Sequence, residues 1–354
     1  MYENVTFESI LDRMLERVPE SMDKREGSII YDALAPAAVE LQLMYIELDV
    51  ILKETFGDTA SREYLIRRAA ERGIKPFPAS KAILKATYTP TSIDIPIGSR
   101  FSLNELNYVV LEKIGDGQLK IECESLGKSG NGYFGNVIPI EYIEGLETMQ
   151  ITELLIPGED EEDTEDLRKR YFDSFNSKAY GGNIDDYLKK TNSIAGVGST
   201  KVTPIWNGGG TVKLTILNSE YNKASSELIK SVQNIIDPQQ DALGKGVAPI
   251  GHIVTVDTAS EVKVNISTKL VFEDGHSFSN LKNAIKEKIS EYLLEIRKQW
   301  ATQTASVVRL AQLESRIMSV EGVLDISGTK INEKPENLIL DKYEIPIMGV
   351  LSND

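Results

Sequence analysis

The sequence has few of the residues on which catalysis and disulfide-based folds depend. Its 354 residues include one cysteine, Cys123, and two histidines, His252 and His276. A single cysteine allows no internal disulfide, so the fold must be held by packing, which suits a reducing compartment during assembly. Histidine is the commonest general base and metal ligand, yet neither histidine has a partner at ligand spacing. We therefore interpret all three as structural residues and predict no catalytic, cofactor-binding or metal site.

Basic residues, export signals and long apolar runs are scarce as well. The chain carries 54 Asp and Glu against 39 Lys and Arg, a formal charge of −15, which disfavours nucleic-acid binding. Acids stand at Glu3, Glu8 and Asp12, where a signal peptide needs a basic region and an apolar run. No apolar stretch approaches the roughly 20 residues of a membrane span. We expect a protein made and assembled in the cytoplasm, with no membrane insertion and no nucleic-acid partner.

Three segments superficially resemble ligand-binding motifs, and none of them fits. Residues 126–130 resemble a phosphate-binding loop, but Glu122 stands where the first glycine of that loop belongs. The acidic run 159–166 lacks the central glycine and the ligand spacing of a calcium loop, so we interpret it as a solvated linker leading into a helix. The glycines at 208–210 connect two predicted strands and indicate a hairpin tip.

The apolar spacing changes twice along the chain and predicts a multidomain α+β fold. Helical spacing dominates up to residue 78, alternation with a period of two begins at residue 79, and mixed strand and helix patterns follow residue 156. Prolines and glycines mark the two changes. We predict a helical bundle segment at 1–78, a small β-rich domain at 79–156, and two α+β units at 157–260 and 261–354.

The last segment has the clearest patterns. Residues 262–272 alternate as a strand with one buried face, and residues 278–300 carry apolar side chains at steps of three and four, as a helix does. Residues 193–197 and 319–323 both pass from a predicted helix through Gly-Val into a predicted strand. This short repeat is compatible with two related α+β units.

A long helix predicted over residues 28–56 is apolar on more than one side. One apolar series follows steps of four and three, the spacing of a helix seam, and further apolar residues at 43–46 and 50–51 widen the surface. Such a helix needs more than one packing neighbour, which can be the helix predicted over residues 61–72 or another subunit. The candidate partner-interface residues are Leu34, Leu41, Tyr45, Leu48 and Leu52.

A series of short landmarks runs in a fixed order through the chain. They are Arg25-Glu26-Gly27-Ser28, Ile95-Pro96-Ile97-Gly98, Gly135-Asn136-Val137, Pro157-Gly158, Leu167-Arg168-Lys169-Arg170, Gly181-Gly182 and Gly209-Gly210-Thr211-Val212. Each landmark alone has low specificity, but their order and spacing extend from about residue 25 to residue 349. In this order they resemble the baseplate J-like family of contractile phage tails and R-type phage-tail-like bacteriocins.

The resemblance implies a structural component of the baseplate wedge, with no catalytic residue and no cofactor. Members of the family pack with a second copy of themselves and with a smaller wedge protein, and six wedges form a ring around the hub. The implied partners also include sheath-initiator, hub and tail-fibre attachment proteins. The implied place of action is the extracellular phage or bacteriocin particle, where the ring links fibre binding to sheath contraction.

A ring that changes shape suits rigid domains joined by short hinges. The candidate hinge residues are Pro76, Pro78, Pro157 and Gly158. Two other functional classes stay open. The small β domain and its glycine-rich loops also suit a tail-associated adaptor or a carbohydrate-binding module, and a tail-associated hydrolase that uses carboxylates is the remaining class.

Overall fold

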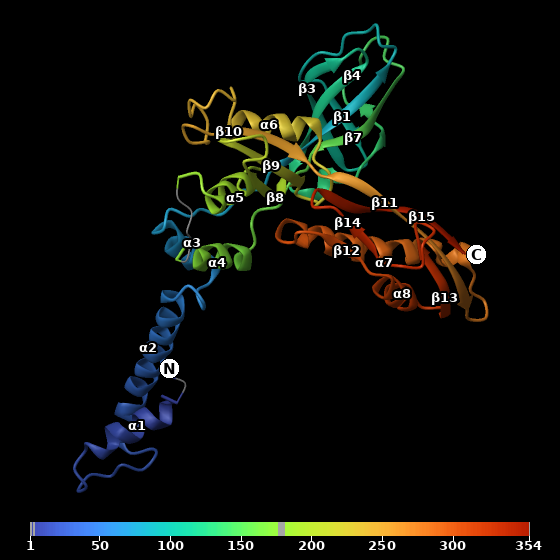
Figure 1. Ribbon diagram of the computed structural model, residues 1–354. Coiled ribbons are helices and arrows are strands. Elements are labelled where there is room, and N and C mark those ends of the chain that lie inside the picture. The colour runs from blue at the N-terminus through green and yellow to red at the C-terminus, as the bar shows by residue number, and fades with distance from the viewer. Residues whose placement is uncertain (1, 3, 176–180, 354) are drawn as a thin grey trace. The chain divides into compact units, whose positions relative to one another are not determined.

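The computed structural model describes residues 2, 4–175 and 181–353. The chain forms two compact units, the first from Met1–Phe77 and Glu162–Ser177 and the second from Pro78–Glu161 and Lys178–Asp354. About 33% of the chain is helical and about 31% lies in strands, which confirms the predicted multidomain α+β fold class (Figure 1). Residues 162–177, from the segment predicted as an α+β unit at 157–260, therefore group with the N-terminal helices.

The first unit contains, in its described residues, the helices α1 (Phe7–Glu16), α2 (Ile29–Thr55), α3 (Arg62–Ala70) and α4 (Thr164–Asp173). Helix α1 packs along α2, with Ile10 and Leu11 buried against Ala38 (Figure 1). Helix α3 packs mainly on α4, through Leu65 and Leu167. The two helix pairs thus have separate hydrophobic cores.

Two arginines of α4 tie this helix to other segments of the first unit. Arg168 donates a hydrogen bond to the carbonyl oxygen of Gly57, just after α2. Arg170 donates to both carboxylate oxygens of Glu162 at 2.6 and 2.8 Å, and its guanidinium carbon lies 3.8 Å from the centre of the Phe77 ring. Charge-assisted, bidentate contacts of this kind fix geometry as well as adding stability. These contacts explain the two arginines in the sequence landmark Leu167-Arg168-Lys169-Arg170.

The first part of the second unit is a β-barrel. Its strands are β1 (Lys81–Thr89), β2 (Arg100–Leu103), β3 (Leu106–Gly115), β4 (Gln118–Leu126), β5 (Gly135–Asn136), β6 (Ile138–Pro139) and β7 (Thr148–Ile156). Their spatial order is β5-β7-β1-β4-β3-β2-β6. Only Val137 separates β5 from β6 in the chain, and these strands pair with β7 and β2, so the sheet closes on itself. Alternate residues of β1, from Ala82 to Tyr88, fill the interior.

A three-stranded sheet with two helices follows. Its elements are α5 (Ile184–Asn192), β8 (Val197–Pro204), β9 (Thr211–Asn218), α6 (Ser226–Ile236) and β10 (Ile253–Thr258), with strand order β10-β9-β8. Leu214 of β9 and Leu228 of α6 belong to its core. The amide of Gln233 donates to the carbonyl oxygen of Val254 and accepts from the backbone N–H of Val256, at 3.0 and 2.9 Å. Helix α6 therefore satisfies part of the edge of β10, which protects that edge from other strands.

The C-terminal part contains a second three-stranded sheet. Its elements are β11 (Ser260–Phe272), α7 (Phe278–Gln299), a 3₁₀ turn at Trp300–Thr302, β12 (Ser306–Val308), α8 (Leu310–Met318), β13 (Val323–Ile331), β14 (Leu338–Leu340) and β15 (Glu344–Asn353). The strand order is β13-β11-β15, and β12 pairs with β14. Helices α7 and α8 cover one face, where Ile289 and Leu313 pack against Ile266 (Figure 1). The strand and helix predicted over 262–272 and 278–300 match β11 and α7.

The short repeat in the sequence has the same backbone geometry at both places. Helix α5 is followed by Ser193 and helix α8 by Ser319, and each hydroxyl donates to the carbonyl oxygen three residues earlier, at 2.8 and 2.7 Å. Gly196 and Gly322 then adopt φ values of +86° and +91° before β8 and β13 begin. Glycine adopts this conformation without strain. The repeat is therefore a shared helix-to-strand turn.

Lys201 of β8 is buried where the middle sheet meets the C-terminal part of the second unit. Its Nζ donates to the carbonyl oxygen of Lys342 at 2.8 Å and lies 4.3 Å from the centre of the Trp300 ring. Leu217 and Ile345 belong to the same buried cluster as Trp300. Burial lowers the pKa of Lys201 to about 8, and the charge of Lys342 acts in the same direction. A cation in apolar surroundings thus joins the two sheets.

Candidate assembly interface

Helix α2 has the most exposed apolar surface of any long helix that the structure describes. In its most apolar stretch of 18 residues, only 6% of the residues are buried. Helix α1 covers one side, where Ala38 is fully buried and Tyr31, Leu34 and Tyr45 are half-buried. Most of the remaining apolar side chains of α2 face solvent. Large exposed apolar surfaces on soluble proteins mark interaction sites.

These exposed side chains form two stripes on α2. The Leu41 stripe consists of Leu41, Met44, Leu48 and Ile51, and the Leu43 stripe consists of Val39, Leu43, Ile46 and Val50. The eight side chains are 38% to 61% exposed. Both stripes step by threes and fours, as the contact line of a helix bundle does.

The two stripes point in different directions. At about 100° per residue, they lie on opposite sides of the face that α1 covers. On the far side of the helix they are separated by an acidic row, Glu40, Glu47 and Glu54, at steps of seven residues. A single flat partner would leave one stripe exposed. The arrangement of α2 therefore suits two neighbours, in addition to α1.

The structure distributes the predicted seam residues over these surfaces. Leu34 and Tyr45 pack partly against α1, whereas Leu41 and Leu48 belong to the exposed Leu41 stripe. Leu52 is half-buried near the end of α2. The helix predicted over residues 61–72 corresponds to α3, which packs mainly on α4, and the main neighbour of α2 within the chain is α1. The role of the five residues in partner binding remains a prediction.

The length and composition of α2 correct one expectation from the sequence. In the part of the chain that the structure describes, α2 is the one helix long and apolar enough to cross a membrane. The expectation that no stretch approaches this length was wrong, because Asp32 and Glu40 interrupt the apolar run without lowering its average below that of a membrane span. A buried core helix of a soluble protein can have the same length and composition, whereas this helix is exposed.

The predicted hinge residues lie near the places where the chain passes between the two units. Pro76 lies one residue before Phe77, which ends the first stretch of the first unit, and Pro78 begins the second unit. Gly158 is firmly held within the second unit, because the side chain of Asn131 accepts from its N–H at 2.8 Å and donates to its carbonyl oxygen at 3.0 Å. Pro157 lies beside it. The next change of unit falls between residues 161 and 162, so the hinge assignment remains a prediction.

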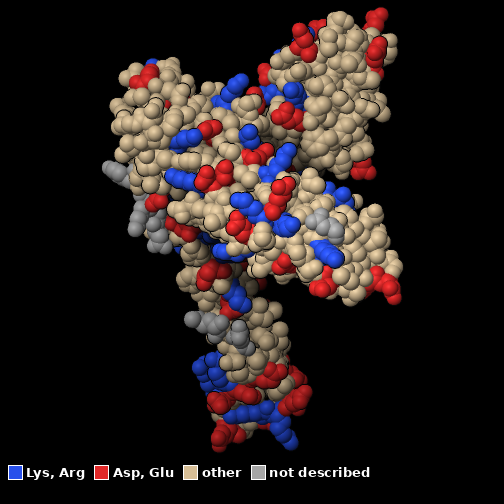
Figure 2. Space-filling view, turned by 45° about the vertical axis from the view of Figure 1, so that its right-hand side comes forward, with Lys and Arg blue, Asp and Glu red and all other residues tan. Residues whose placement is uncertain are grey.

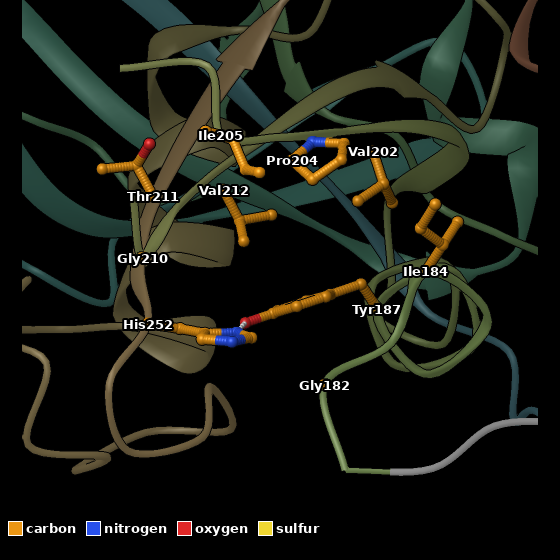
Figure 3. A pocket seen from close by; sticks show the side chains of 10 residues that line it. All are labelled: Gly182, Ile184, Tyr187, Val202, Pro204, Ile205, Gly210, Thr211, Val212 and His252. Atoms are coloured by element: carbon orange, nitrogen blue, oxygen red, sulfur yellow. Dashed lines mark hydrogen bonds between the residues drawn. The ribbon is translucent and has the colours of Figure 1, made fainter. Parts of the chain in front are cut away.

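The pocket that contains His252 is mainly apolar. Its volume is about 130 Å³, and its walls include Val202, Pro204 and Val212 (Figure 3). The hydroxyl oxygen of Tyr187 lies 2.8 Å from Nδ1 of His252, and the two ring planes are inclined by 20° with their centroids 5.9 Å apart. Burial raises the pKa of Tyr187 to about 12, so its hydroxyl stays protonated at neutral pH. This pair fits the structural interpretation of His252, although the sequence did not predict its partner.

The other candidate residues also occupy structural positions. Cys123 is fully buried in the barrel, and burial raises the pKa of its thiol. The backbone N–H of His276 donates to the carbonyl oxygen of Glu273, and its ring packs closely on Gly322. Within residues 4–175 and 181–353, no group of three or more His, Cys, Asp or Glu side chains is arranged to hold a metal ion. The exposed surface of α2 therefore remains the main candidate site.

Sequence comparison finds relatives that match this chain over nearly its whole length. Models described as the baseplate J-like central domain and the baseplate J-like protein C-terminal domain match residues 179–258 and 264–353. The phage-like element PBSX protein XkdT of Bacillus subtilis (strain 168) is 40% identical over 351 residues, covering 99% of this chain and 97% of that protein. The uncharacterized protein YqbT of the same strain matches equally, at 40% identity over 99% of this chain and 97% of its own.

A solved structure of the anti-feeding prophage baseplate also aligns with the chain. It covers 99% of this chain and 91% of its own, with 7% sequence identity and a TM-score of 0.40. The assignment of the chain to a family therefore rests on the sequence matches.

Proposed function

The chain belongs to the baseplate J-like family, and from this premise we propose that it is a wedge component of a contractile tail. Membership confirms the resemblance carried by the sequence landmarks and makes the chain a structural component of a phage-type baseplate. The wedge role is the finer part of the proposal. The observation that supports it best is the exposed apolar surface of α2, which requires partners.

The two stripes of α2 support a bundle with two kinds of neighbour. In the proposed wedge, one stripe packs against α2 of a second copy of this chain and the other packs against a helix of the smaller wedge protein. Each stripe supplies four apolar side chains at bundle spacing. The acidic row between the stripes stays at the solvent-exposed margin, where charged residues belong in a bundle.

The rest of the chain gives the proposed wedge its remaining contacts. Strand β13 lies at one edge of the C-terminal sheet and β15 at the other, so a second contact between copies can form there. Six wedges would form the ring around the hub, in contact with sheath-initiator and tail-fibre attachment proteins. Changes of shape would occur at the hinge candidates Pro76, Pro78, Pro157 and Gly158. The wedge would be assembled in the bacterial cytoplasm and would act in the extracellular particle, without bond chemistry.

The proposal is tested by measuring the mass of the protein alone and after co-expression with the products of neighbouring reading frames. We expect a stable complex of fixed stoichiometry, with two copies of this chain for each smaller partner. A chain that stays monomeric with every neighbour would contradict the wedge assignment. Saturable binding of a glycan by that monomer would then favour the alternative of a carbohydrate-binding or adaptor module.

A further inference from the structure

The barrel is more acidic than the two sheets that follow it in the second unit. Residues 81–156 contain 10 acidic and 6 basic residues, whereas residues 178–354 contain 21 acidic and 20 basic residues. Acidic side chains are visible at the margin of the barrel, at the upper right of Figure 2. An uneven charge of this kind favours partners of the opposite charge and speeds their encounter. The barrel is therefore the part of this unit best suited to a basic partner.

A groove of about 530 Å³ opens on this barrel between two glycine turns. In the first turn, the N–H of Ser99 donates to the carbonyl oxygen of Pro96 at 3.1 Å, and Gly98 has a φ of +89°. In the second, at residues 143–146, the N–H of the last residue donates to the carbonyl oxygen of the first at 3.3 Å, and Gly145 has a φ of +80°. Both turns place glycine where a left-handed conformation is required. The walls of the groove are thus formed before any partner arrives.

The charge of the groove is negative. Asp94, Glu141 and Glu144 line it, together with Arg100. The guanidinium of Arg100 donates two hydrogen bonds of 2.6 Å to the carboxylate of Glu124, so its charge is already compensated. The three lining carboxylates consequently dominate the local field.

Two exposed apolar side chains accompany these carboxylates. Ile97 is 72% exposed at the corner of the first turn, where a polar residue would be better solvated. Tyr142 is 88% exposed, so its ring is open to a ligand. Tyrosine rings attract cations, and the apolar stem of a lysine or arginine covers apolar surface while its charged end stays near water. A ring, an apolar side chain and carboxylates together match the chemistry of a basic side chain.

We propose that this groove docks a lysine- or arginine-bearing segment of a partner protein. Tyr142 and Ile97 contact the stems of the basic side chains, and the carboxylates of Asp94, Glu141 and Glu144 bind their charged ends. The contact is separate from α2 and does not depend on the wedge bundle. It gives the barrel a partner-binding role of its own.

The test uses the full chain and a fluorescein-labelled pentapeptide of alternating lysine and leucine, with binding followed by fluorescence anisotropy. The double substitution Glu141→Lys and Glu144→Lys should weaken saturable binding about tenfold. The matched control is Glu105→Lys with Glu153→Lys, which makes the same change in net charge at exposed acids of the barrel outside the groove lining. The control should leave binding within about twofold of the unchanged protein.

A third variant tests the contribution of the Tyr142 ring separately from that of the carboxylates. Tyr142→Ala leaves the net charge unchanged and should weaken binding about threefold, because it removes one exposed cation–π contact. Thermal unfolding of each variant shows whether the barrel remains folded. Equal weakening by the groove pair and the control pair would show that net charge alone attracts the peptide, and would overturn the proposal. Failure of the unchanged protein to bind saturably would also overturn it.

Discussion

The two longest helices that the structure describes differ in how much of their apolar surface is buried within the chain. Helix α7 has 22 residues and buries Ile285, Ile289 and Leu293 in the core of the C-terminal part. Helix α2 has 27 residues, and its most apolar window is 6% buried. Helix α7 has one apolar face and packs against neighbours within the chain, whereas α2 is apolar on several sides and, among the described residues, packs mainly on α1. The difference supports the proposal that α2 packs against neighbours outside this chain.

The strongest test of this difference between α2 and α7 is to make the Leu41 stripe polar. Leu41→Gln with Leu48→Gln should weaken assembly with the partner chains at least a hundredfold, because burying each leucine is worth about 1.5–3 kcal/mol. The isolated chain should keep its fold, since both side chains already face solvent. Co-purification and the mass of the complex measure the effect.

The matched control for that pair lies on the barrel. Ile114→Gln with Leu126→Gln changes two apolar side chains that are 42% and 60% exposed, outside α2. Assembly should survive this change. Normal complexes from the α2 pair, or equal loss from both pairs, would remove the Leu41 stripe from the interface.

A second pair of substitutions compares the helices in the isolated chain. Ile289→Ala in α7 should reduce the free energy of unfolding of the C-terminal part by about 2–5 kcal/mol, because it leaves a cavity in a closed core. Leu48→Ala in α2 should change it by less than about 0.5 kcal/mol. Urea unfolding of the two variants measures both values. Similar losses would mean that the chain alone already buries α2.

The end of α7 offers a test by pH, through Trp300 and Lys201. The pKa of Lys201 is lowered in the folded protein, so the unfolded chain binds more protons between pH 8 and 10.5, and this residue makes stability rise with pH across that range. Lys201→Met should abolish this rise and stabilise the protein by roughly 2–3 kcal/mol near pH 7. Unfolding of both proteins at pH 7, 8.5 and 10 measures the difference. A difference that does not vary with pH would contradict the burial of a charged Lys201.

The smallest expected effect concerns the start of α2. The hydroxyl of Ser28 accepts a hydrogen bond from the N–H of Tyr31 at 3.3 Å. Ser28→Ala should reduce the stability of the first turn by about 1 kcal/mol, and Ser28→Asp should preserve it as another capping residue. Amide hydrogen exchange at residues 31–33 reports the change. Equal exchange in the two variants would show that α2 does not depend on this cap.

The elements with strong periodicity were predictable from the sequence. The strand over 262–272 and the helix over 278–300 each have a single buried face, so their patterns appear directly in β11 and α7. The long helix over 28–56 was predicted from apolar residues at steps of four and three, although these residues lie on more than one side of the helix. Its neighbours were not predictable, because an apolar residue shows that burial is needed and does not show what covers it. The packing of helix α1 on α2 was the missing information.

No local sequence pattern predicts the closure of the barrel or the contact between Tyr187 and His252. Strands β5 and β6 are two residues long, which is too short for a periodic pattern, yet they close the sheet. Tyr187 of α5 and His252, just before β10, are 65 residues apart and meet only in the folded chain. Gly158 was predicted as a hinge residue because a Pro-Gly pair is typical of a break, and that role remains a prediction. Its hydrogen bonds to Asn131 depend on a contact between segments 27 residues apart.

The most direct test of the account compares amide hydrogen exchange in α2 and α7, in the chain alone and in the complex with its co-expressed partners. We predict that residues 39–51 of α2 become at least about a hundredfold more protected in the complex, whereas α7 keeps the same protection in both states. Unchanged exchange in α2 upon formation of a stable complex would contradict the claim that its exposed stripes are the assembly surface.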